Sequence, residues 1–139
     1  ILLLNDTKED QLTENFKNLV DKTINISRFS NIKALNQIRE LNLDIIIDLM
    51  GYTSKQRIEL FKNRMAKKQI IWMGYCNTTG LKNMDYIISD PNLIYPNEQN
   101  LYSEKVIYLP KIWKHSILYL HFFDFALVSN QDDNRIRLH

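Results

Sequence analysis

Two short segments of the chain combine glycines, tyrosines and threonines, which are residue types that can hold a sugar or a phosphate. One is G-Y-T at residues 51–53, and the other is G-Y-C-N-T-T-G at residues 74–80. Hydroxyl and glycine N–H groups donate hydrogen bonds that sugar hydroxyls and phosphate oxygens accept. The candidate cleft-lining residues are Gly51, Tyr52, Thr53, Gly74, Tyr75, Asn77, Thr78, Thr79 and Gly80. The spacing equally fits a structural role, in which glycines end strands, threonines cap helices and tyrosines pack at the rim.

Each segment directly follows an apolar run that predicts a buried strand. Residues 44–50 contain three consecutive isoleucines, as in a parallel strand buried on both faces, and residues 69–73 form the second run. The carboxyl ends of parallel strands share one edge of the sheet, where ligands bind. A helix predicted over residues 55–63 would point its positive N-terminus at the same edge. We therefore expect the two segments to form one site.

The remaining elements predict an α/β fold with a Rossmann-like, mostly parallel sheet and flanking helices. Further strands are expected at residues 1–4, 23–26, 84–89 and 105–109, and helical segments at 9–20 and 97–102. Another helix begins after Ser30 or Asn31, with Ile32, Leu35, Ile38 and Leu41 directed inward. Residues 1–112 are predicted to form the domain. Residues 113–139 show neither a helical nor a strand period, and we expect an irregular tail that is frame-shifted or disordered.

Composition narrows the classes of function. A net charge of +2 over 139 residues does not indicate a nucleic-acid partner, and Cys76 is the single cysteine. The apolar stretch at 117–128 is too short to span a membrane, and no secretory signal is visible, so a cytoplasmic protein is expected. His115, His121 and His139 have no ligand spacing. We expect neither a metal nor a cofactor.

Asp48 raises a different possibility. It ends a strand, and Asn5 and Asp6 end the first one, as in the acidic pocket of a response-regulator receiver domain that binds Mg²⁺ and accepts a phosphoryl group. The residue after Met50 is glycine rather than the usual proline, and the loop at 74–80 has no counterpart in such domains. A receiver-like phosphoacceptor is thus an alternative, as is a non-catalytic module that binds protein acceptors.

Several motifs in order resemble the catalytic region of family-41 glycosyltransferases, the O-linked N-acetylglucosamine transferases and their bacterial relatives. The matching runs are D-I-I-I-D-L-M-G-Y-T at 44–53, residues 57–64, residues 69–80, M-D-Y-I-I-S-D at 84–90 and L-Y-S-E-K-V-I-Y-L-P at 101–110. Residues 1–43 match more loosely. From about Lys111 onward the resemblance is expected to end.

The resemblance implies the N-terminal half of a GT-B enzyme, whose loops form the acceptor side of a cleft between two Rossmann-like halves. Such enzymes transfer N-acetylglucosamine or another hexose from a UDP-sugar to Ser or Thr of a protein or peptide, with inversion and without a metal. The lysine that stabilises departing UDP is expected outside this chain, so no catalytic residue is assigned. UDP-sugar binding is expected only with the other half, and the isolated chain is expected to be inactive.

Two departures from the family's usual motifs affect the candidate site. Ala66, Lys67, Lys68 and Gln69 stand where the family has Ala-Pro-Ile/Val-Gln, which removes a rigid proline. Cys76 and Asn77 stand where it has Pro-Gly, and asparagine tolerates a positive φ better than most residues. The turn at residues 74–80 is therefore expected to survive.

Overall fold

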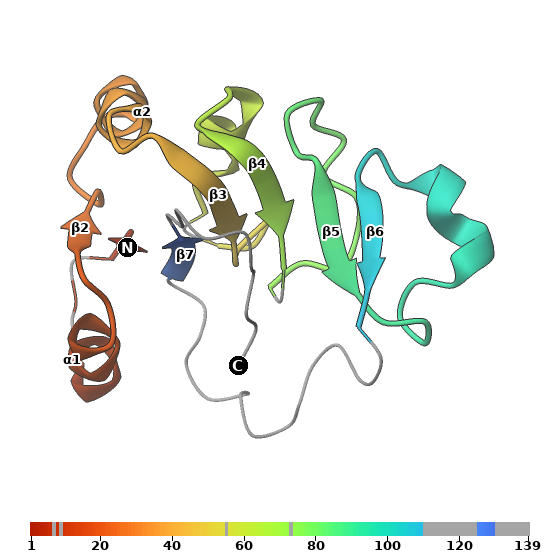
Figure 1. Cartoon of the computed structure of the whole chain (residues 1–139), viewed down its shortest axis with the longest axis horizontal. Coiled ribbons are helices and arrows are strands. Elements are labelled where there is room, and N and C mark those ends of the chain that lie inside the picture. Colours follow the sequence, from red (N-terminus) through yellow and green to blue (C-terminus); the bar gives the residue numbers. More distant parts are fainter. Residues whose placement is uncertain (7, 9, 55, 73, 110–124, 130–139) are drawn as a thin grey trace.

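A computed structural model describes residues 1–6, 8, 10–54, 56–72, 74–109 and 125–129 of the chain. They form a seven-stranded sheet in the order β2-β1-β7-β3-β4-β5-β6 (Figure 1). The strands are β1 (Leu2–Leu4), β2 (Thr23–Asn25), β3 (Leu43–Asp48), β4 (Ala66–Ile71), β5 (Tyr86–Ser89), β6 (Lys105–Tyr108) and β7 (Phe125–Ser129).

Six of the seven strands run in the same direction. β1 pairs in parallel with β2, and β3, β4, β5 and β6 pair in parallel with one another in succession. β7 is antiparallel to both β1 and β3, which makes these two strands parallel to each other. The carboxyl ends of the six parallel strands therefore share one edge, and the predicted mostly parallel α/β sheet is confirmed.

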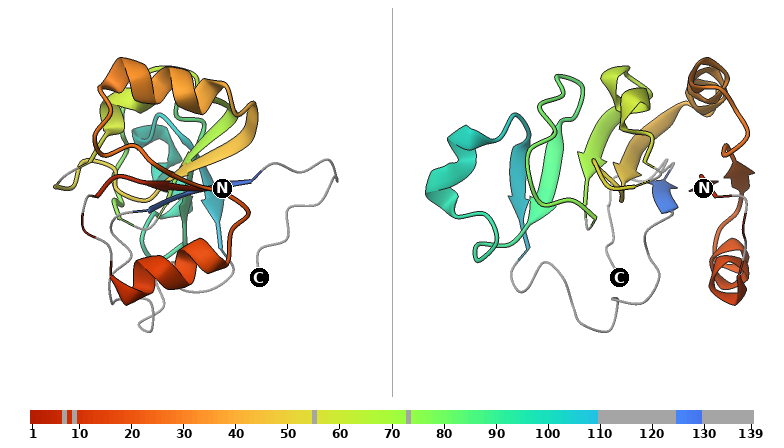
Figure 2. Two further views of the ribbon diagram at one scale, coloured as in Figure 1. Left: turned by 90° about the vertical axis from the view of Figure 1, so that its left-hand side faces the viewer. Right: turned by 180° about the vertical axis from the view of Figure 1, so that it is seen from behind.

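The two α-helices cover opposite faces of the sheet (Figure 2). Helix α1 (Gln11–Asn18) begins at Asp10, whose carboxylate accepts the Thr13 N–H at 2.8 Å. On its face of the sheet, Leu2 and Leu4 pack with partly buried Phe16. Helix α2 (Asn31–Arg39) is capped by Ser30, as predicted, and lies over the larger core. No helix of the described residues is long and apolar enough to cross a membrane.

One of the four residues predicted to point inward from this segment does not: Ile38 is buried and Leu35 and Leu41 pack against the core, but Ile32 is exposed. Ala34 and Ile38 are fully buried, whereas Ile32 is 74% exposed. At 3.6 residues per turn, Ile32 lies about 160° around the helix axis from Ala34. The small Ala34 side chain lets the helix approach the sheet closely, so the expectation that Ile32 points inward is wrong.

The helix predicted over residues 55–63 is also shorter than expected. The chain forms a five-residue 3₁₀-helix, η1 (Ile58–Lys62), which buries Ile58, Leu60 and Phe61. Arg57 precedes it in a non-helical conformation. A single 3₁₀ turn has little aligned dipole, so the predicted positive helix end at the binding edge is not formed. A second 3₁₀-helix, η2 (Pro96–Leu101), matches the helical turn expected there.

Strand β7 has no counterpart among the sequence-based expectations. Residues 125–129 were expected to belong to an irregular tail, but they pair with β1 on one side and with β3 on the other. Pairing with strands far away in the sequence selects this conformation, and local periodicity carries no trace of such pairing. The rest of the predicted tail, at 113–124 and 130–139, lies outside the described residues.

Candidate functional site

Two loops meet at the carboxyl edge of the sheet, as the sequence predicts. The β3 loop (residues 49–54) and the β4 loop (residues 74–80) follow adjacent parallel strands, in which Asp48 pairs with Ile71. The rings of Tyr52 and Tyr75, one from each loop, pack edge to face with centroids 5.4 Å apart. Edge-to-face packing places the positive ring edge against the negative face of its partner. The two loops are thus one unit.

Glycines make this contact possible. A Cβ atom on Gly51 would lie 2.3 Å from the Cβ of Tyr75, and one on Gly74 would lie 2.0 Å from the main-chain oxygen of Leu49. Gly51 and Gly80 have positive φ angles of 56° and 69°. Asn77 does not, because Asn42 is the sole non-glycine residue with positive φ among those described. The β4 turn therefore depends on Gly80 and not on the asparagine in place of the family's glycine.

The Asp48 side chain stabilises the β3 loop through hydrogen bonds to its main chain. Its buried carboxylate accepts the N–H groups of Met50 at 3.1 Å and Gly51 at 2.9 Å. Burial raises the pKa of Asp48, and the two main-chain hydrogen bonds partly oppose that rise. No cluster of three or more His, Cys, Asp or Glu side chains that could hold a metal ion occurs in the described part of the chain. The geometry gives Asp48 a loop-building role.

The β4 loop is fixed by hydrogen bonds from both sides. The Tyr52 hydroxyl donates to the main-chain oxygen of Thr79 at 2.9 Å, and the Tyr102 hydroxyl donates to that of Cys76 at 3.3 Å. Thr53 instead donates its hydroxyl to the Met50 oxygen at 2.8 Å, within its own loop.

The threonines of the β4 loop point toward a buried carboxylate. Glu104, which is 1% exposed, accepts the Thr79 N–H at 2.7 Å and the Thr78 hydroxyl at 2.7 Å, and the Thr79 hydroxyl also donates to it. Thr79 itself is 5% exposed. Tyr52, Asn77 and Gly80 are the exposed members of the predicted set.

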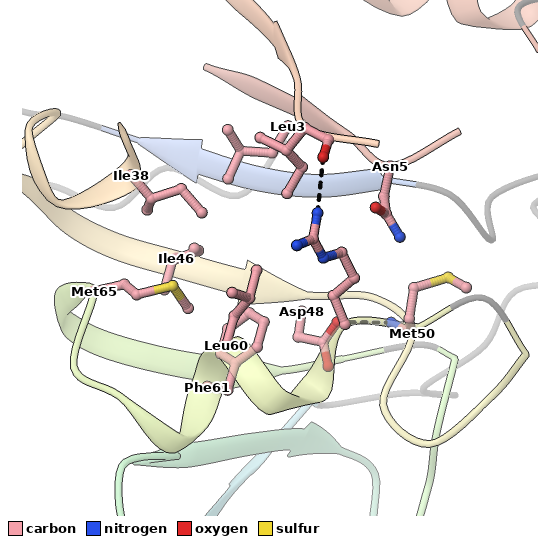
Figure 3. A pocket seen from close by; sticks show the side chains of 11 residues that line it. Leu3, Asn5, Ile38, Ile46, Asp48, Met50, Leu60, Phe61 and Met65 are labelled. Carbon is pink, nitrogen blue, oxygen red and sulfur yellow. Dashed lines mark hydrogen bonds between the residues drawn. The ribbon is translucent and has the colours of Figure 1, made fainter. Parts of the chain in front are cut away.

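A hollow of about 50 Å³ lies beside the β3 loop (Figure 3). Asn5 and Met50 line it where β1 and β3 end, and Ile38 and Met65 line its apolar part. Arg57 also lines it. Its guanidinium donates to the main-chain oxygens of Ile26 at 2.7 Å and Phe29 at 3.0 Å, and to the Asn31 side chain at 2.6 Å.

Arg57 thereby joins the segment between β2 and α2 to the segment that follows the β3 loop. Burial lowers the pKa of Arg57, but a guanidinium remains charged at neutral pH. This connection could not be predicted from the sequence, because it depends on contacts about thirty residues away.

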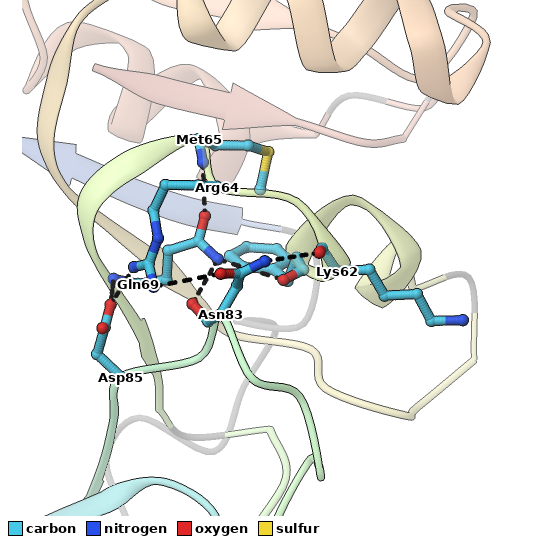
Figure 4. Close-up of polar contacts among 7 residues, drawn as sticks. Lys62, Arg64, Met65, Gln69, Asn83 and Asp85 are labelled. Carbon is cyan, nitrogen blue, oxygen red and sulfur yellow. Dashed lines mark hydrogen bonds and ion pairs between the residues drawn. The ribbon is translucent and has the colours of Figure 1, made fainter.

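A polar cluster supports the start of β4, at the opposite end of the strand (Figure 4). The fully buried Gln69 accepts the Met65 N–H at 2.8 Å and donates to the oxygens of Asn83 at 2.7 Å and Phe61 at 3.3 Å. Arg64 pairs with Asp85, which also accepts the Gln69 N–H at 2.8 Å. These contacts fix the strand whose other end carries the β4 loop.

Six of the nine predicted site residues fall into two groups. Gly51, Tyr52, Gly74 and Tyr75 join the loops, and Thr78 and Thr79 bind Glu104. The sequence does not identify Glu104 as a member of the site, because its partners lie about twenty-five residues away. The one available signal was a glutamate beside two hydroxyl-bearing residues at the start of a strand.

Comparison with known proteins decides the family. The model for "Glycosyl transferase family 41" matches residues 4–138. The chain belongs to glycosyltransferase family 41. The match extends well beyond Lys111, so the expected end of the similarity there is wrong. Membership also sets aside the receiver-like alternative, since the Asp48 oxygens accept hydrogen bonds from their own loop.

Two relatives and a solved structure illustrate the likeness. A Caenorhabditis elegans UDP-N-acetylglucosamine--peptide N-acetylglucosaminyltransferase is 34% identical over 105 residues, which is 73% of this chain and 9% of that protein. The probable SPINDLY enzyme of this class from Solanum lycopersicum is 34% identical over 107 residues, or 74% of this chain and 12% of that protein. A mutant O-GlcNAc transferase from Thermobaculum terrenum superposes with a TM-score of 0.76 at 29% identity.

The chain spans only part of these proteins. It corresponds to about a tenth of the length of the curated relatives and to 21% of the solved Thermobaculum terrenum chain, with 80% of its own length aligned. The fold and the family follow from these matches, and the fold is that of the corresponding part of an O-GlcNAc transferase.

Proposed function

We propose that this chain forms the acceptor side of a protein O-glycosyltransferase. The proposed reaction transfers N-acetylglucosamine, or another hexose, from a UDP-sugar to a Ser or Thr hydroxyl of a protein. Family membership supports this reaction class, because the relatives carry such names. The observation that carries the proposal is the joined pair of loops at the carboxyl edge of the sheet, where α/β folds bind ligands.

In the proposed reaction, the acceptor hydroxyl oxygen forms a bond to the anomeric carbon while the bond from that carbon to the UDP oxygen breaks. The hydroxyl proton is released to water, and UDP leaves with the bonding electron pair. A single displacement of this kind inverts the anomeric configuration. The loops of this chain would hold the acceptor in line with that bond, and such positioning supplies a large part of a catalytic rate.

The residues that stabilise the departing diphosphate are proposed to lie in another part of the enzyme. Neither the β3 loop nor the β4 loop contains a lysine or an arginine. The Arg57 guanidinium is bound to the segment before α2, and Arg64 pairs with Asp85. Stabilisation of developing charge is often the largest catalytic contribution. The 139-residue chain by itself is therefore expected to transfer no sugar and to bind UDP more weakly than micromolar.

The test uses the full-length gene product, UDP-N-acetylglucosamine and a Ser/Thr peptide, with mass spectrometry of the peptide. We expect one N-acetylhexosamine per modified hydroxyl, and no product on the same peptide with alanine at every Ser and Thr. Failure to modify proteins or peptides with any UDP-hexose would refute the proposed transfer. Calorimetry that gave micromolar UDP affinity for the 139-residue chain would refute the assignment of UDP binding to another part.

A further inference from the structure

The segment just before β6, at residues 102–104, binds the β4 loop at Cys76, Thr78 and Thr79. Glu104 lies in this segment, and its carboxylate receives four donors: the Thr79 N–H, the hydroxyls of Thr78 and Thr79, and the Ser103 hydroxyl at 3.1 Å. An ionised carboxylate has about four lone-pair positions, so this set fills it. Buried carboxylates are rare unless they are satisfied in this way.

The hydrogens of the two threonine hydroxyls are both donated inside the protein. Thr78 Oγ1 accepts the N–H groups of Ser103 at 3.1 Å and Gly80 at 3.2 Å while it donates to Glu104. Thr79 Oγ1 donates to Glu104 and accepts the Leu81 N–H at 3.3 Å. A hydroxyl has one hydrogen and two lone pairs, so neither threonine retains a donor for a ligand.

The contacts of Glu104 complete a frame around the β4 loop. Tyr102, which lies in the same segment as Glu104, donates its hydroxyl to the main-chain oxygen of Cys76. Tyr52, which lies in the β3 loop, donates its hydroxyl to the main-chain oxygen of Thr79. Because the Thr79 N–H donates to Glu104, both the N–H and the C=O of Thr79 are hydrogen-bonded. The exposed residues of the loop, Asn77 and Gly80, lie on either side of the threonines that Glu104 holds.

We propose that Glu104 is a positioning residue that holds the β4 loop in the shape that receives the protein acceptor. This inference rests on the proposed transfer reaction and adds a residue to it. Glu104 acts through Thr78 and Thr79, and it does not touch the substrate because it is 1% exposed. A glutamine of the same size replaces one accepting oxygen by an NH2 group, which cannot accept the hydrogens of the Thr78 and Ser103 hydroxyls, so these contacts must rearrange.

The test compares Glu104→Gln with Glu98→Gln in the full-length gene product. Glu98 is a matched control because it accepts only the Tyr95 N–H, at 3.0 Å, among the hydrogen bonds that the described structure gives its side chain. For Glu104→Gln we expect faster amide exchange of the peptide that contains residues 74–80. We also expect a fall of about 10–100-fold in kcat/KM for the acceptor, with the KM for UDP-N-acetylglucosamine changed less than about threefold. Glu98→Gln should leave all three values unchanged.

A second pair of variants keeps the test decisive if Glu104→Gln does not fold. Thr79→Val removes the hydroxyl that donates to Glu104, and Thr79→Ser keeps it. We expect Thr79→Val to reproduce the loss and Thr79→Ser to restore most of it. The effects of Thr79→Val and Glu104→Gln should also be less than additive, since both remove one interaction.

The possible outcomes separate the two ideas. If the protein without substitutions transfers no sugar, the proposed function is refuted, and so is the acceptor role of the loop. An active protein in which Glu104→Gln behaves like Glu98→Gln refutes the positioning role alone. Equal losses in Thr79→Val and Thr79→Ser, or a large rise in the KM for the UDP-sugar, also overturn it.

Discussion

Replacement of Gly51 by alanine tests the contact between the two loops, and Gly80 supplies a matched control. Both glycines have positive φ angles, 56° and 69°. They differ in surroundings: an added Cβ on Gly51 would lie 2.3 Å from Tyr75 Cβ, whereas one on Gly80 has nothing within 4 Å. The two substitutions therefore share the cost of a left-handed backbone, and only Gly51→Ala forces the loops apart.

The expected magnitudes follow from these contacts. An alanine in the left-handed conformation destabilises the folded state by about 1–2 kcal/mol. Alanine also restricts the unfolded chain more than glycine does, which stabilises the folded state by about 0.4–1 kcal/mol. Gly80→Ala should thus destabilise by about 0.5–1 kcal/mol. Carbon atoms in contact prefer about 3.5–4.0 Å, and Tyr75 Cβ is attached to the main chain and cannot rotate away. Overpacking of this kind adds about 1–3 kcal/mol, so Gly51→Ala should cost about 2–4 kcal/mol in free energy of unfolding.

Urea unfolding of the chain, followed by circular dichroism, measures the difference. With a denaturant dependence of about 1–3 kcal/mol per molar, Gly51→Ala should shift the midpoint about 1 M below that of Gly80→Ala. In the full-length gene product, Gly51→Ala should also lower acceptor transfer. Equal midpoints for the two variants would show that the β3 and β4 loops do not abut, and the site would have to be rebuilt.

Two further predictions concern the cluster at the start of β4. Gln69→Leu should lower the free energy of unfolding by at least about 3 kcal/mol, because it leaves the three main-chain partners of the Gln69 side chain unpaired. The control substitution Gln11→Leu, at an exposed position, should change it by less than about 0.5 kcal/mol. Similar urea midpoints for the two variants would contradict this prediction. Burial tends to raise the pKa of Asp85, but hydrogen bonds from Arg64 and the Gln69 N–H and nearby positive charge outweigh it, so its folded pKa is lowered. Its stabilisation is present above the unfolded pKa of about 3.9 and is lost as pH falls through the folded pKa. The stability deficit of Asp85→Asn should therefore shrink between pH 6 and pH 3, and a deficit independent of pH would exclude the charged pair as its cause.

Much of the fold could be predicted because its signals are local. Three consecutive isoleucines in β3 indicate a strand buried on both faces, and Ser30 is a good helix cap. The approach of the two loops also followed from strand order and handedness alone. The inward position of Ile38 in α2 was predicted as well, but the exposure of Ile32 was not, because the small Ala34 is the residue buried against the sheet beside Ile38.

The parts that were missed depend on distant contacts. β7 is defined by strands at the other end of the chain. The truncation of the helix near residue 58 coincides with the Arg57 side chain binding the oxygens of Ile26 and Phe29. Glu104 lies some twenty-five residues from the threonines that it holds. The sequence made Thr78 and Thr79 candidate cleft-lining residues, but their carboxylate partner could only be identified in three dimensions.

The central position of β7 has a consequence for biosynthesis. β7 lies between β1 and β3 and pairs with both, and it is made nearly eighty residues after β3. At about 5–20 residues per second, a ribosome needs roughly 4–16 s to reach it. During that interval the nascent chain carries two unpaired strand edges, one from each part of the future sheet. Exposed edges of this kind are templates for aggregation, so the emerging chain depends on protection until Ser129 has been added.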